Sequence, residues 1–121
     1  MKATEGKLGR VFVVRLEDGD MLPACIERLA EKKGITCGHV VLIGGIGGGE
    51  VVGNGLIVPD EDGRPALHMH AALGRSGQTL TGCIRYGVST WVVAEAIIYE
   101  ITGVKAARLP DKETGFTLLE M

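Results

Sequence analysis

Short runs of β-branched and aliphatic residues, separated by glycine-rich turns, constrain the fold of this 121-residue chain more than any other feature. The runs lie at 10–17, 35–47, 49–59, 66–73, 78–87, 88–103 and 116–120. Apolar and polar residues alternate in several of them, as is typical of strands, and only one segment has helical spacing. The pattern predicts a single α+β domain over residues 1–121, with a predominantly antiparallel or mixed sheet of about six or seven strands and one main helix.

The helical segment lies at 21–34, where apolar side chains recur every three or four residues. Asp20 is predicted to be its N-cap, Pro23 falls in the first turn, and Gly34 follows two lysines at the end. The face directed to the core would comprise Leu22, Cys25, Ile26, Leu29 and Ala30.

Charge and cysteine content limit the classes of function. The formal net charge is −2 and the pI is about 5.9, unlike the basic footprint of a nucleic-acid binder. The three cysteines are an odd number without framework spacing, which favours a reducing cytoplasm over a disulfide scaffold. No apolar run reaches the roughly 18 residues of a membrane helix, and no signal-peptide pattern opens the chain. We therefore expect a cytoplasmic protein without a membrane partner.

The glycine cluster GGIGGGEVVGNG, at 44–55, does not have the pattern of a nucleotide-binding loop. It contains neither a P-loop sequence nor a G-x-G-x-x-G that opens a helix, and a β-like segment follows it. We interpret the cluster as a bulged bend or as a backbone-crowded contact between subunits.

The segment LHMHAALGRSGQTLTGCI, at 67–84, contains the strongest candidate site. His68 and His70 point to the same face of a strand, about 6–7 Å apart. If GRSG is a tight hairpin with Arg75 and Ser76 at its centre, His68 lies opposite Cys83 and His70 lies diagonal to it. All three side chains would then project from one face.

Two imidazoles and a thiolate are a suitable ligand set for Zn²⁺, which takes such donors in tetrahedral geometry. A fourth position would remain for water, a substrate or another side chain, so a structural and a hydrolytic zinc are both compatible. The geometry depends on parity, because a three-residue loop would turn Cys83 to the opposite face. The alternative is two half-exposed histidines and a small buried side chain.

Three further residues are weaker candidates. His39 could supply another ligand, although a hydrogen-bonded core or interface histidine is the simpler interpretation. Glu95, within an apolar strand, could be a general base or could orient a ligand, and a structural hydrogen bond or ion pair is the alternative. Glu50 could likewise have a chemical role or an ordinary structural one. No catalytic residue can be assigned.

The order of several motifs resembles the PPC (plants and prokaryotes conserved) domain, which also occurs in plant AT-hook nuclear proteins. These motifs are RLEDGD, GHVVLIGGIG, DGRPALHMHAAL, TGC and the AE of WVVAEAIIYE, between about residues 10 and 102. The chain is identified as a prokaryotic stand-alone member. The resemblance implies an α+β protomer, a homotrimer and a metal held by the H-x-H pair and a histidine of the next strand. His68 and His70 match the pair, and Cys83 stands where many relatives have that histidine.

These observations predict a small cytoplasmic, homotrimeric, metal-binding protein of unassigned cellular role, with zinc held by His68, His70 and Cys83. The first alternative is a DNA-associated regulatory or assembly module, as the family label suggests. The chain contains no R-G-R-P core of an AT-hook, so DNA is a weakly supported partner. A zinc-dependent enzyme acting on a small metabolite is the second alternative, and binding is favoured over catalysis.

Overall fold

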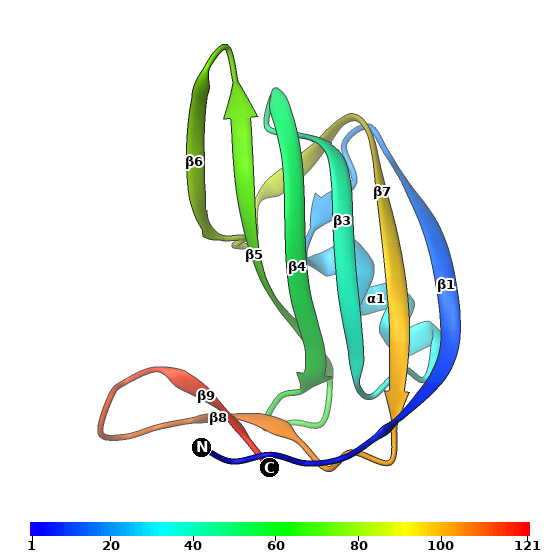
Figure 1. The fold of residues 1–121 in the computed structure, drawn as a ribbon, viewed down its shortest axis with the longest axis vertical. Coiled ribbons are helices and arrows are strands. Elements are labelled where there is room, and N and C mark those ends of the chain that lie inside the picture. Colours follow the sequence, from blue (N-terminus) through cyan, green and yellow to red (C-terminus); the bar gives the residue numbers. More distant parts are fainter.

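The computed structural model describes residues 1–121 as one large sheet with a single helix against it, and a small separate hairpin (Figure 1). The strand order is β1-β7-β3-β4-β5-β6, β2 pairs with β7, and β8 pairs with β9. All pairings are antiparallel, so the predicted α+β class is confirmed in its antiparallel form. The bounds are β1 Lys7–Glu17, β2 Met21–Leu22, α1 Ala24–Lys33, β3 Gly38–Ile46, β4 Gly49–Pro59, β5 Pro65–Arg75, β6 Gln78–Cys83, β7 Val88–Thr102, β8 Ala107–Pro110 and β9 Thr117–Glu120.

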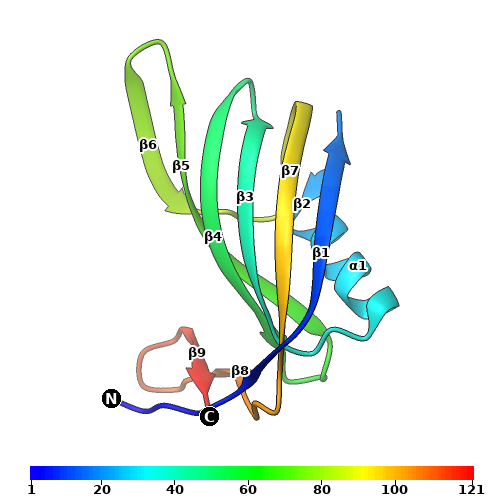
Figure 2. The same cartoon turned by 45° about the vertical axis from the view of Figure 1, so that its right-hand side comes forward.

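The core lies between α1 and one face of the sheet, whereas the other face has no helix over it (Figure 2). Ile26 and Ala30 of α1 are fully buried against strand residues such as Val40, Met69 and Ile98. Alternation along each strand places the intervening side chains on the second face, which we call the open face. No helix in the structure has the length and apolar character needed to cross a membrane.

The start of the helix differs from the prediction. Asp20 is not the N-cap: its side chain accepts a hydrogen bond from the backbone N–H of Glu17, 2.9 Å away. Two strand residues, Met21 and Leu22, intervene, and Pro23 occupies the N-cap position without a side-chain bond. The short strand β2 takes up the residues that would have joined Asp20 to the helix. The end is as predicted, at Gly34.

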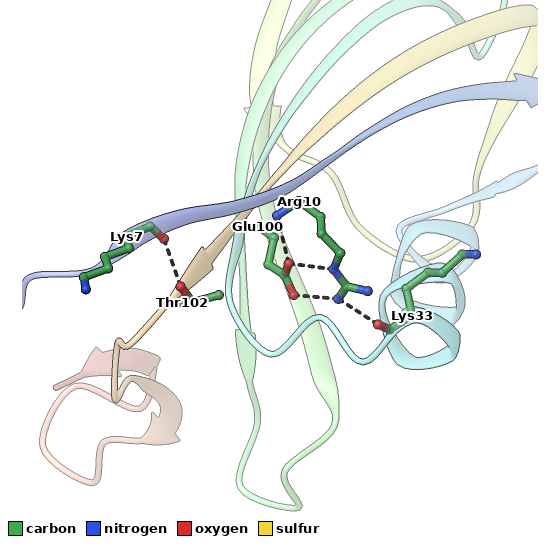
Figure 3. A network of polar contacts seen from close by, with 5 residues as sticks. All are labelled: Lys7, Arg10, Lys33, Glu100 and Thr102. Atoms are coloured by element: carbon green, nitrogen blue, oxygen red, sulfur yellow. Dashed lines mark hydrogen bonds and ion pairs between the residues drawn. The ribbon is translucent and has the colours of Figure 1, made fainter.

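A partly buried ion pair joins β1, β7 and the end of the helix (Figure 3). Arg10 donates to both carboxylate oxygens of Glu100, through Nε at 2.8 Å and Nη2 at 2.6 Å. Nη2 also donates to the carbonyl oxygen of Lys33, the last residue of α1. The Glu100 side chain is only 11% exposed, so the charge-assisted bonds hold these three elements in one arrangement.

The glycine cluster forms the β3–β4 hairpin and an irregularity in the pairing of β3 with β7. The register shifts between Gly44 and Ile46, as expected for a bulged bend, which was one of the two predicted interpretations. Gly45 lies so close to β7 that a Cβ atom there would overlap the carbonyl oxygen of Trp91. Glycine is therefore required for backbone approach rather than for phosphate binding.

Candidate metal centre

The β5–β6 hairpin has a two-residue loop, as predicted, but the loop lies one residue further along the chain. Arg75 pairs with Gln78, so Ser76 and Gly77 form the turn, not Arg75 and Ser76. Both have positive φ, 52° and 79°, as the favoured hairpin turn of type I′ requires. Glycine adopts this conformation without strain, whereas the predicted turn would have placed the long Arg75 side chain in it.

Moving the turn by one residue shifts the pairing of β5 with β6 by two residues, and the direct and diagonal neighbours of Cys83 are exchanged. His70 lies directly opposite Cys83, and His68 is the diagonal neighbour, the reverse of the prediction. Because the N–H of Ile84 bonds to the carbonyl of Met69, the adjacent pair of His70 and Cys83 is a non-hydrogen-bonded pair. Side chains approach most closely at such pairs. The three side chains keep a common face, because an even shift preserves parity.

The potential ligand atoms of His68, His70 and Cys83 all lie within 4.8 Å of one another, on the open face. The two Nε2 atoms are 3.0 Å apart. Tetrahedral zinc with ordinary bond lengths places two nitrogens about 3.3 Å apart, and nitrogen and sulfur about 3.6 Å apart. The nitrogens are already at nearly that separation, and the sulfur of Cys83 lies within 4.8 Å of both histidines. The donor set therefore fits zinc in both chemistry and spacing.

The surroundings of the site are positively charged. Burial, the guanidinium of Arg108, the neighbouring His70 and Arg85 all lower the pKa of His68. A lower pKa keeps this imidazole neutral, which is the state that binds a metal. Burial also lowers the pKa of Arg108, a β8 residue that lies near both His68 and Cys83.

A cavity of about 480 Å³ adjoins the cluster at the edge of β5, and both His68 and Cys83 line it. Arg108 forms part of its wall, and so does Tyr86, whose hydroxyl donates to Glu27 at 2.7 Å. That bond raises the pKa of Tyr86 to about 12, which keeps its hydroxyl protonated. Sequence analysis missed Arg108 and Tyr86, since neither belongs to a motif, and only the packing of β8 reveals the first.

The weaker candidates lie outside this cluster. His39 is on β3, where its Nε2 lies 3.1 Å from Oδ1 of Asn54 and its ring stacks on Tyr99. Glu95 is on β7, between β1 and β3, and so is separated from β5 by two strands. Glu50 is at the start of β4, opposite Gly74.

A larger groove, with a volume of about 1020 Å³, lies at the end of the sheet formed by the β3–β4 and β5–β6 hairpins. Arg75 covers the ring of Trp91 there, with the guanidinium carbon 5.0 Å from the ring centroid. Glu50 also lines this groove. Histidines and cysteines are absent from its lining, so the metal chemistry points to the smaller cavity instead.

Known proteins that resemble this chain include members of one domain family and a protein described as metal-containing. The family model described as the Plants and Prokaryotes Conserved (PCC) domain matches residues 3–56 and 47–102. A plant- and prokaryote-conserved protein from Pyrococcus horikoshii is 25% identical, with a TM-score of 0.87 over 100% of this chain and 98% of its own. A metal-containing protein from Archaeoglobus fulgidus is 24% identical, with a TM-score of 0.86 over 100% of both chains. A candidate DNA-binding protein from Ralstonia eutropha is 20% identical, with a TM-score of 0.77 over 90% of both. No curated protein matches the chain.

Proposed function

The chain belongs to the Plants and Prokaryotes Conserved domain family, and from this premise we propose that it is a zinc-binding member of the prokaryotic, stand-alone kind. Its ligands are His68, His70 and Cys83, and it acts as a single cytoplasmic domain over residues 1–121. One observation carries the proposal: three potential ligand atoms from two adjacent strands lie within 4.8 Å. The relative from Archaeoglobus fulgidus, described as metal-containing, supports it.

The ligand set favours zinc over harder cations. Thiolate and imidazole donors suit zinc, whereas magnesium and calcium prefer oxygen ligands. His70 and Cys83, directly paired across the β5–β6 hairpin, would supply one nitrogen and one sulfur. Neither Glu95 nor Glu50 belongs to the cluster, and both carboxylate oxygens of Glu27, which lines the adjoining cavity, already accept hydrogen bonds from Leu67 and Tyr86. We therefore favour binding over catalysis.

Elemental analysis of the purified protein tests the proposal. After dialysis, the native protein should retain close to one zinc per chain, and the double variant His70→Ala, Cys83→Ser should lose it. Cys25→Ser is the matched control, because Cys25 packs against the core on α1 and lies outside the cluster. Equal zinc content in the native protein and the double variant would refute the assignment.

The same proposal includes a homotrimer that forms through the open face. Four side chains of this face are large, apolar and well exposed: Val11, Val13, Ile43 and Val52, with Val13 84% exposed. Several large apolar side chains exposed on one face of a sheet favour an association site there. The family resemblance supports three copies.

Light scattering coupled to size-exclusion chromatography measures the oligomer. The native protein should elute with three times the mass of one chain, and Val13→Glu should shift it to lower mass. Leu80→Glu is the control, because Leu80 is 76% exposed but lies on the opposite face of the sheet. A monomeric native protein, or equal mass in all three preparations, would contradict the trimer.

A DNA-associated role is the alternative, and it rests on the relatives described as candidate DNA-binding proteins. Arg64 and Arg75 do not lie together on a single chain: Arg64 precedes β5 and Arg75 ends it, about 36 Å away along the strand. With a net charge of −2, phosphate contacts would be few. A mobility shift on duplex DNA at low salt would favour this role over the first proposal.

A further inference from the structure

The cavity beside the metal ligands carries two guanidinium groups without an anionic partner. Arg85, from the loop after β6, and Arg108, from β8, both line it together with His68 and Cys83. The ion pairs of the structure are Lys2–Glu120, Arg10–Glu100 and Arg15–Glu17, so neither arginine is neutralised. Two positive charges thus border the site where zinc would leave an open coordination position.

Arg108 carries the clearest sign of a missing ligand. Its Nε is buried and has no hydrogen-bond partner. A buried N–H without an acceptor destabilises the folded state, so native structures rarely keep one without a reason. Arg108 also lines the neighbouring cavity, of about 330 Å³, that contains both His68 and His70. Its side chain therefore stands between the two approaches to the ligand cluster.

The carboxylate in the same cavity does not serve these arginines. Glu27 accepts the backbone N–H of Leu67 through Oε1 at 2.9 Å and the hydroxyl of Tyr86 through Oε2 at 2.7 Å. Both oxygens are thus engaged by neutral donors. The rest of the wall is mixed, with apolar side chains such as Ile84 and Phe116 beside the polar ones. The cavity accordingly offers cationic donors at one part and apolar surface at another.

We propose that this cavity binds a small molecule with one carboxylate group and an apolar body, the carboxylate lying between Arg108 and the metal. The inference rests on the proposed zinc site. A planar carboxylate matches the fork of a guanidinium, and its second oxygen can take the open position on the metal. The apolar body lies against Ile84 and Phe116, and Arg85 adds positive charge at the entrance. The volume of about 480 Å³ is within the range of small-ligand pockets.

Isothermal titration of the zinc-loaded protein with benzoate tests this inference, with inorganic phosphate as the comparison anion. Arg108→Gln should weaken benzoate binding at least 10-fold, and Arg85→Gln should weaken it less. Arg28→Gln is the matched control, because Arg28 is exposed on α1 and does not line the cavity. Circular dichroism checks that each variant is folded, and zinc content is measured on every sample.

The readouts separate failure of the inference from failure of the zinc site. If the native protein holds no zinc, the proposed function falls, whatever the titration shows. If zinc is retained but benzoate does not bind, or binds the native protein and Arg108→Gln equally, the carboxylate site is overturned. Tighter binding of phosphate than of benzoate would overturn the assignment of ligand class. Loss of affinity in Arg108→Gln with retained affinity in Arg28→Gln supports the proposal.

Discussion

Zinc should raise the thermal stability of the native protein, and replacement of His70 by alanine should remove most of that rise. A metal that binds the folded chain shifts the folding equilibrium according to its concentration relative to the dissociation constant. His70 is the perturbation of choice because it is the direct cross-strand partner of Cys83. It is also exposed, so its removal leaves the core intact.

The size of the effect follows from the chain length. At a zinc concentration one hundred times the dissociation constant, binding stabilises the folded state by about 2.7 kcal/mol. Unfolding entropy is about 2.1 cal/mol/K per residue, or about 0.25 kcal/mol/K for 121 residues, so Tm should rise by about 11 °C. If loss of one of three ligands weakens binding about 100-fold, the same zinc concentration gives about 0.4 kcal/mol and a rise of about 2 °C.

Differential scanning calorimetry of metal-free protein, with and without added zinc, measures the two shifts. His39→Ala is the matched control, since it removes an imidazole from the same face of the sheet without touching the cluster. Its own Tm falls with the lost contact to Asn54, but its zinc-induced rise should equal that of the native protein. An undiminished rise in His70→Ala, or a lost rise in His39→Ala, would refute the assignment of ligands.

Three further predictions concern stability. Gly45→Ala should lower the free energy of unfolding by about 3 kcal/mol or more, measured by urea titration, because the new Cβ overlaps the carbonyl of Trp91. Ile98→Val, at a fully buried site, should lower it by about 1 kcal/mol with an unchanged m-value. Arg10 lowers the pKa of Glu100 from 4.5 to about 2, so this carboxylate stabilises the fold above pH 4.5 and the contribution is lost as pH falls through 2. Tm measured against pH should therefore lose part of its acid slope in Glu100→Gln, and an identical slope would contradict this.

Local patterns predicted the elements of the fold well, because period and turn chemistry are properties of neighbouring residues. The helical face of α1 and the bulge near Gly45 both follow from such patterns. The prediction of Asp20 as N-cap was wrong because a side-chain oxygen can accept a hydrogen bond from any of several nearby N–H groups. Here the donor is the backbone N–H of Glu17. The strand β8 escaped prediction because its four residues are too few to show alternation and they end in Pro110.

The sequence predicted correctly that the three side chains of the candidate site share one face of the sheet, but it did not predict which residues pair across the strands. A turn one residue away from the expected place changed every cross-strand partner, yet left His68, His70 and Cys83 on one face. Side-chain direction depends on whether the register shift is even or odd, and partners depend on its full value. The list of candidate ligands was therefore unaffected by the error in register, whereas the predicted cross-strand partner of Cys83 was wrong.

The end of β6 at Cys83 leaves the space in which arginine side chains lie beside the candidate site. Cys83 is the last residue of β6, so residues 65–68 of β5 lack a paired strand on that side. Glu27 takes the free N–H of Leu67, and the loop after β6 turns away, which opens the cavity at this edge. Arg108 enters it from a hairpin 25 positions further along the chain than Cys83, through contact of β8 with β4. The position of Cys83 at the end of a short strand therefore serves both proposals: Cys83 belongs to the proposed ligand set, and the end of β6 leaves the adjoining cavity open beside it.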